Sequence, residues 1–167
     1  GAVAATVDHA DRKRHQYWRI IRIRHPLKDA LIMNATSNLK FGWLALAFFI
    51  SVGLFLESLH LFKTPFYFEH DLRRELWVLG HAHGALMAIL NIVYALTALR
   101  YEAVGNKLDS WLWLLAGLFI PAGFLLGGVT ASEVDPALWI VLTPMGALCA
   151  LAASARAGMA LLRHRQN

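Results

Sequence analysis

The sequence predicts an all-α integral membrane protein, an up-down-up-down four-helix bundle with a basic N-terminal interfacial segment. Of its 167 residues, 57% are hydrophobic, which is more than a soluble domain of this size normally carries. Four apolar stretches are each long enough to cross a hydrocarbon core of about 30 Å with about 20 residues. They cover residues 41–62, 76–99, 110–132 and 136–159. Backbone groups in lipid must be hydrogen-bonded internally, so we expect helices rather than strands.

The four spans define three segments of the chain. Residues 1–40 form a basic arm, residues 41–159 the four-helix domain and residues 160–167 a basic tail. Short connections between the spans favour antiparallel packing of successive helices. Gly80-x-x-x-Gly84 in the second span and several glycines in the third allow helices to approach closely. Pro121 and Pro144 are expected to kink the third and fourth spans near mid-membrane.

The formal charge of +5 is concentrated next to the first span rather than spread over a surface. This placement favours binding to anionic lipid headgroups and argues against nucleic acid as a partner. Taken together, the segment before the first span, the second connection and the segment after the fourth span carry more lysine and arginine than the first and third connections do together. We therefore expect both termini to be cytoplasmic and the chain to reside in a membrane such as the bacterial inner membrane.

The arm contains the sequence QYWRIIRIR at residues 16–24. As a helix it would be a basic amphipathic segment lying among the headgroups. With a period of two it could instead be a short strand. Pro26 is expected to limit either element. The arm could anchor the chain to the membrane or dock a partner subunit.

Ionisable side chains inside membrane spans are costly and usually functional, and this chain has several. His81 and His83 lie in the second span, and Glu57 and His60 lie near the end of the first. At 100° per residue, His83 shares one arc with the small and polar residues of its span, whereas His81 lies about 160° away. That arc contains Gly80, Gly84, Met87, Asn91 and Tyr94. We therefore expect His83 to face the bundle, and the two imidazoles not to share one centre.

The depths of these residues also match. At 1.5 Å per residue, Glu57 and His83 each lie about 8–10 Å inside the same membrane edge. His60 and His81 are shallower, and Glu133 and Asp135 follow the third span on that side. The sequence therefore predicts that six ionisable groups converge in the outer half of the bundle. Asn91 and Tyr94, deeper in the second span, are expected to form hydrogen bonds between helices.

Imidazole is the usual protein ligand for haem iron, copper and zinc, and carboxylates extend the choice to non-haem iron. Glu57-x-x-His60 has the spacing with which one helix can present two ligands to a metal. The candidate metal ligands are therefore Glu57, His60, His83 and Glu133. For a haem b, the axial ligands would be His83 with His60 or His81. The alternative is that these groups hydrogen-bond to the backbone or pair with one another without any cofactor.

The stretch His83-Gly84-Ala-Leu-Met87 resembles the second helix of the catalytic subunits of haem-copper oxidases and nitric oxide reductases. In that helix a His-Gly pair, followed shortly by Leu-Met, presents an axial ligand to the low-spin haem. The resemblance implies that His83 would be such a ligand. It covers about ten residues, and the chain has neither that family's roughly twelve spans nor its two-histidine copper motif.

Three functional hypotheses follow. The first is a membrane subunit that binds haem b or a transition metal ion in its outer half and transfers electrons within a larger redox complex. The second is a cofactor-free accessory subunit that packs against other membrane subunits through its glycine-lined faces and basic arm. The third is proton or metal-ion passage through Glu57 and His83. A complete enzyme formed by this chain alone is not expected.

Overall fold

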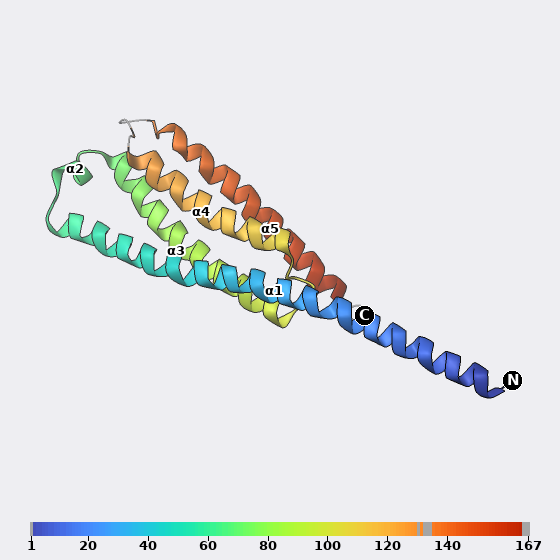
Figure 1. The fold of residues 1–167 in the computed structure, drawn as a ribbon. Helices are drawn as coiled ribbons and strands as arrows, with labels where there is room; N and C mark the ends of the chain where they lie inside the picture. The colour runs from blue at the N-terminus through green and yellow to red at the C-terminus, as the bar shows by residue number, and fades with distance from the viewer. Residues whose placement is uncertain (1, 130, 132–134, 165–167) are drawn as a thin grey trace.

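The structure, a computed structural model, describes residues 2–129, 131 and 135–164. Side chains are described from Asp29 onward, except those of residues 30 and 164. The elements are α1 (Ala2–Leu61), α2 (Pro65–Phe68), α3 (Asp71–Arg100), α4 (Lys107–Val129), the 3₁₀ helix η1 (Leu138–Val141) and α5 (Leu142–His164) (Figure 1). None of the described residues lies in a β-strand, which confirms the predicted all-α class.

Within the described part of the chain, four helical segments are long and apolar enough to cross a membrane, as predicted. They are Leu31–Leu61, Asp71–Arg100, Lys107–Val129 and Leu138–Arg163. The chain is therefore an integral membrane protein by the length and composition of its helices. The first apolar segment starts ten residues before the predicted span, so Asn34 and Asn38 belong to the bundle rather than to the arm.

Successive helices pack against one another, α1 on α3, α3 on α4 and α4 on α5 (Figure 1). A smaller contact joins α1 to α4. The outer helices α1 and α5 bury only 17% and 11% of their apolar segments, whereas α3 and α4 bury 39% and 44%. We call the end that carries α2 and the last turn of α4 the loop end. The opposite end, where α3 ends and α4 begins, is the terminal end.

Two prolines do not act as the sequence suggests. Helix α1 continues through Pro26, so the predicted interruption there, and the alternative of a short strand over residues 21–24, are wrong. A proline removes one backbone hydrogen bond but need not end a long helix. Pro144 lies in the first turn of α5 rather than near mid-membrane. A first-turn N–H has no partner within the helix, so the proline is tolerated there without a mid-span kink.

A buried polar network joins three helices towards the terminal end. The Asn38 side-chain amide of α1 donates to Asn91 Oδ1 at 2.8 Å and to the Ser110 carbonyl at 3.1 Å. Asn91 of α3 donates in turn to the carbonyl of Trp113 on α4 at 3.0 Å, and Ser110 Oγ donates back to Asn38 Oδ1. Asn38 and Asn91 are both fully buried. Asn91 therefore forms the interhelical hydrogen bonds that the sequence predicts.

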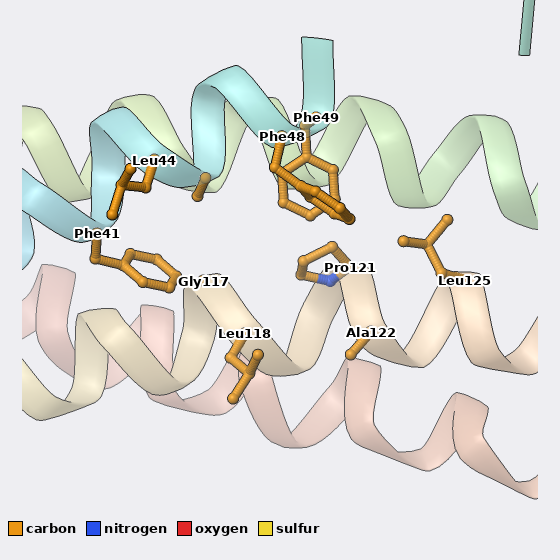
Figure 2. A pocket seen from close by; sticks show the side chains of 10 residues that line it. Phe41, Leu44, Phe48, Phe49, Gly117, Leu118, Pro121, Ala122 and Leu125 are labelled. Atoms are coloured by element: carbon orange, nitrogen blue, oxygen red, sulfur yellow. The ribbon is translucent and has the colours of Figure 1, made fainter. Parts of the chain in front are cut away.

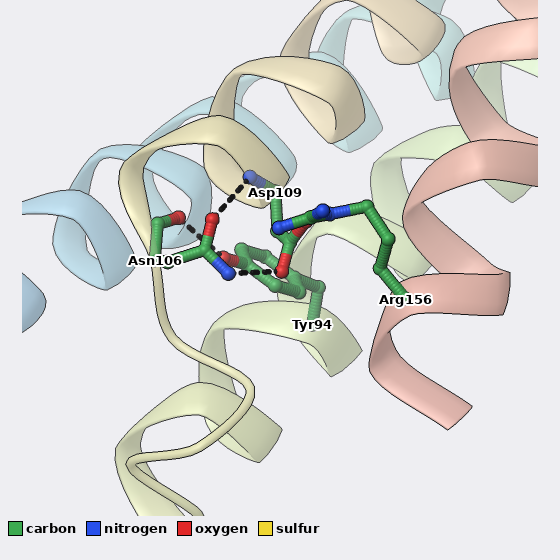
Figure 3. A network of polar contacts seen from close by, with 4 residues as sticks. All are labelled: Tyr94, Asn106, Asp109 and Arg156. Atoms are coloured by element: carbon green, nitrogen blue, oxygen red, sulfur yellow. Dashed lines mark hydrogen bonds and ion pairs between the residues drawn. The ribbon is translucent and has the colours of Figure 1, made fainter. Parts of the chain in front are cut away.

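A second polar cluster fixes the start of α4 against α5 (Figure 3). Asn106 Oδ1 accepts the backbone N–H of Asp109 at 3.0 Å, which makes Asn106 the N-cap of α4, and the Asn106 side-chain amide also donates to the Asp109 carboxylate. The same carboxylate pairs with Arg156 of α5. Tyr94 Oη donates to the Asn106 carbonyl at 3.3 Å, so Tyr94 also connects two helices as predicted. This cluster sets the register of α3, α4 and α5 at the terminal end.

Candidate functional site

His81 forms a hydrogen bond between α3 and α1. Its Nδ1 lies 2.7 Å from the carbonyl oxygen of Phe49. Because a carbonyl can only accept, Nδ1 must carry the proton, and the lone pair is then on Nε2. The imidazole fits against Gly53, where an added Cβ would lie 2.5 Å from His81 Cε1. Gly53 is therefore the residue that allows this ring to enter the helix contact.

His83 lies on the other side of α3 and contacts α4 instead. Its Nδ1 is 2.9 Å from the carbonyl oxygen of Leu79, in its own helix. Its ring centroid lies 4.9 Å from that of Phe124. The two imidazoles therefore have different neighbours, as the helical wheel predicts. However, the hydrogen bond to another helix comes from His81 and not from His83, whose side chain is half-buried.

Glu57 and His60 are exposed at the end of α1. His60 Nδ1 lies 3.4 Å from the Leu56 carbonyl, at the long limit of a hydrogen bond. The His60 ring packs edge-on against Tyr67 at 5.0 Å and Phe68 at 5.2 Å, both from α2. Glu133, the remaining candidate ligand, lies outside the described residues. The described candidates are thus spread over different faces of the bundle.

The described residues contain no group of three or more His, Cys, Asp or Glu side chains that could hold a metal ion. Glu57, His60 and His83 are therefore not gathered into one ligand set. The imidazoles of His81 and His83 nevertheless have the hydrogen bonding that is typical of metal ligands. In a histidine that binds a metal through one ring nitrogen, the other nitrogen usually donates to a carbonyl or carboxylate. In both His81 and His83, Nε2 is bonded to no other described residue. These nitrogen atoms are thus suitable ligands for a metal ion or haem iron, but too few of them lie together among the described residues to form a complete site.

A large apolar groove lies between α1 and α4 (Figure 2). It has a volume of about 350 Å³. The rings of Phe41, Phe48 and Phe49 form its α1 side, and Pro121 and Leu125 lie across from them on α4. None of the three candidate haem-ligating histidines lines this groove. A haem placed in it would therefore receive no axial ligand from His60, His81 or His83.

The loop end is closed by Arg73, which sequence analysis placed in an ordinary connection. Its side chain is only 6% exposed. Arg73 Nε donates to the Gly128 carbonyl at 3.2 Å, and Nη1 donates to the Phe66 carbonyl at 3.0 Å. The guanidinium also lies 4.0 Å from the centroid of the Phe66 ring. A cation at the last turn of α4 satisfies free carbonyls and the negative end of the helix dipole, so Arg73 ties α2 to α4.

Tyr67 of α2 packs beneath this closure and is fully buried. Its ring stacks on Trp77 with the centroids 6.3 Å apart, and Trp77 Nε1 donates to the Leu125 carbonyl at 3.2 Å. The Tyr67 hydroxyl is buried with no hydrogen-bond partner among the described residues. Burial raises the pKa of the Tyr67 phenol above its ordinary value, with Arg74 acting in the opposite direction. Tyr67 therefore remains a neutral phenol throughout the neutral pH range.

Sequence reasoning missed Asn38, Asp109 and Arg73. The Asn106-x-x-Asp109 spacing before an apolar run is a capping signal that could have located Asp109. Arg156 lies within the predicted fourth span, residues 136–159, and could have been recognised as an intramembrane cation needing a partner. At 100° per residue, Arg73 lies at the same angle as Asn91, eighteen residues later, whereas Arg74 lies about 100° away, so the helical periodicity of α3 could have located Arg73.

Comparison of the chain with protein-family models, with curated proteins and with solved structures found no match to any of them.

Proposed function

We propose that this protein is a subunit of a larger membrane redox complex, in which one of the α3 histidines holds a haem b or a transition metal ion together with another chain. The metal would be copper, iron or zinc. The observation that carries this proposal is the state of His81 and His83. Each has its Nδ1 committed to a backbone carbonyl, and each leaves Nε2 without a partner among the described residues.

An unpaired nitrogen inside a membrane span is unfavourable, because the hydrocarbon offers no hydrogen bond in exchange for water. A metal ion, or a donor from another subunit, would remove that cost. The described part of this chain gathers no set of three ligands around either imidazole, so the site would be completed from outside it. When bound, haem iron or copper would supply one-electron chemistry, and this chain would hold and orient the cofactor through Nε2.

The resemblance of His83-Gly84-Ala-Leu-Met87 to a haem-ligating helix supports His83 as the principal ligand, with His81 or His60 as further candidates. In this proposal the terminal end faces the cytoplasm of a bacterial inner membrane, and the loop end faces outward. The greater number of lysines and arginines near the terminal end supports this orientation. Glu57, exposed near the loop end, is then a peripheral group that could bind a metal only with help from a partner.

A cofactor-free accessory subunit is the second candidate, and one observation favours it. His81 already has a structural role, because its ring packs against Gly53 of α1 and its Nδ1 donates a hydrogen bond to a carbonyl of the same helix. Such a histidine needs no metal to account for its presence. In this case His83 Nε2 would accept a hydrogen bond from a neighbouring subunit.

The test is to isolate the full chain from its native membrane in a mild detergent, together with whatever it binds. We expect a Soret band that shifts on reduction, or stoichiometric metal by elemental analysis. His83→Ala should abolish this signal. His25→Ala, which removes a histidine outside the apolar spans, should leave the signal intact. A colourless, metal-free preparation would refute the redox proposal and leave the accessory subunit.

A further inference from the structure

The groove between α1 and α4 has dimensions that identify what can fill it. Its α1 wall extends from Phe41 to Phe49 and its α4 wall from Gly117 to Leu125, each about 12 Å long at 1.5 Å per residue. The volume of about 350 Å³ counts only positions open to the centre of a water molecule, so dividing it by that length and adding a water radius of about 1.4 Å on each side gives a channel roughly 9 Å wide. All ten lining residues are apolar or glycine.

A whole transmembrane helix is too wide to enter this groove. A helix with its side chains is about 10–12 Å across, which is wider than the channel. A single extended hydrocarbon chain fits. Water would find no hydrogen-bonding side chain on these walls, and an empty space of this size would forfeit packing contacts along its whole length. The groove is therefore suited to one flexible apolar chain.

A second groove continues along the same two helices towards the loop end. It has a volume of about 240 Å³, is lined by residues including Val52, Trp77 and Val129, and shares Leu125 with the first groove. From Gly117 to Val129 the two grooves follow α4 for about 18 Å. That distance is comparable to one leaflet of the hydrocarbon core, which is about 15 Å thick. A chain that enters at the loop end could thus lie in both grooves.

The charges at the loop end indicate the kind of headgroup. Residues on either side of α2 carry both signs, as in the ion pair in which Arg74 Nη2 lies 2.7 Å from Asp71 Oδ1. Among the other described residues near α2, Glu57, Glu69 and Glu75 are exposed and outnumber the exposed Lys63, because Arg73 is buried. Exposed carboxylates repel an anionic headgroup, whereas the ammonium group of a zwitterionic headgroup can pair with them.

We infer that the groove between α1 and α4 is a binding site for one acyl chain of a zwitterionic phospholipid, whose headgroup lies at the loop end. This site does not depend on the redox proposal. The lipid would complete the weak contact between α1 and α4 and thereby hold the outer helix α1 against the bundle.

The test uses the full chain reconstituted in phosphatidylethanolamine vesicles that contain a lipid with a diazirine in its acyl chain. After extraction and extensive washing with detergent, light-induced crosslinks should remain on the peptides that contain residues 41–49 and 117–125. Crosslinks on the exposed α5 face around Ala147 should be lost, because lipid there is bulk lipid. Native mass spectrometry should show the same phospholipid retained by the protein.

Ala122→Phe fills the groove from α4 without adding polarity, and we expect it to abolish both the retained lipid and the groove crosslinks. Ala147→Phe, the same substitution on the exposed face of α5, should leave both unchanged. The inference is overturned if labelling is equally persistent on α5 and in the groove. It is also overturned if a quinone or a protein is recovered in place of the phospholipid, or if Ala122→Phe retains the lipid. If Ala122→Phe does not fold, the comparison of groove and α5 crosslinks in the wild-type protein still tests the inference.

Discussion

Replacing Gly53 by alanine should break the contact between α1 and α3 at His81. An alanine Cβ at this position would lie 2.5 Å from His81 Cε1 and 3.0 Å from Nε2, closer than such atoms can approach. The ring must then move, and its 2.7 Å hydrogen bond to the Phe49 carbonyl is lost or lengthened. The substitution adds one methyl group, so its whole effect comes from this displacement and from the change in helix propensity.

The expected cost follows from two contributions. An interhelical hydrogen bond in a membrane protein contributes about 0.6 kcal/mol on average and up to about 1.7 kcal/mol. Overpacking a tight contact costs about 1–3 kcal/mol. Alanine offsets part of this, because it is favoured over glycine in a helix by about 0.5–1 kcal/mol. We therefore expect Gly53→Ala to lower the free energy of unfolding by about 1–3 kcal/mol.

The assay is reversible unfolding of the purified chain in mixed micelles, followed by far-UV circular dichroism. Gly158→Ala is the matched control, since an added Cβ there meets nothing within 4 Å. It should be neutral or slightly stabilising. In a His81→Ala background, Gly53→Ala should likewise become nearly neutral, because the ring that it displaces is gone. The double-mutant cycle should give a coupling energy of about 1–3 kcal/mol. Additive effects of the two substitutions would refute the packing argument.

Three further predictions use the same assay. Arg156→Leu should lower the free energy of unfolding by about 3–5 kcal/mol, because it leaves the Asp109 carboxylate, which is only 3% exposed, without its cation. Adding Asp109→Asn should restore much of this loss, and a double variant as unstable as Arg156→Leu would argue against the ion pair. Asn38→Leu should cost about 1–3 kcal/mol, because Asn91 Oδ1 would then be buried without a donor; an unchanged midpoint would contradict the network. Tyr67→Phe should leave stability unchanged or higher near pH 7, because the Tyr67 hydroxyl has no partner to lose. Above about pH 10 the wild type should lose stability relative to Tyr67→Phe. Because the pKa of Tyr67 is raised in the folded state, the phenol ionises first in the unfolded state and so favours unfolding. Parallel plots of unfolding free energy against pH for the two proteins would contradict this.

The sequence alone was enough to identify the membrane spans, because the rule behind them is local. A helix in lipid needs only length, apolar side chains and its own backbone hydrogen bonds, and residues 76–99 show all three. Helical periodicity was also sufficient to place Asn91 and Tyr94 on the packed side of α3. The same periodicity correctly separated His81 from His83. In each case the deciding quantity is a spacing along one helix.

The tertiary structure decided which group each polar side chain meets, because that depends on the rotation and depth of a second helix. His81 reaches the Phe49 carbonyl only because Gly53 leaves space on α1, and a periodicity in α3 cannot show this. Periodicity in α3 places Arg73 on the packed side, but only the tertiary structure shows that its partners there are the carbonyls of Gly128 and Phe66. Whether scattered imidazoles form a ligand set is likewise a property of several helices packed together, and no single stretch of sequence contains it.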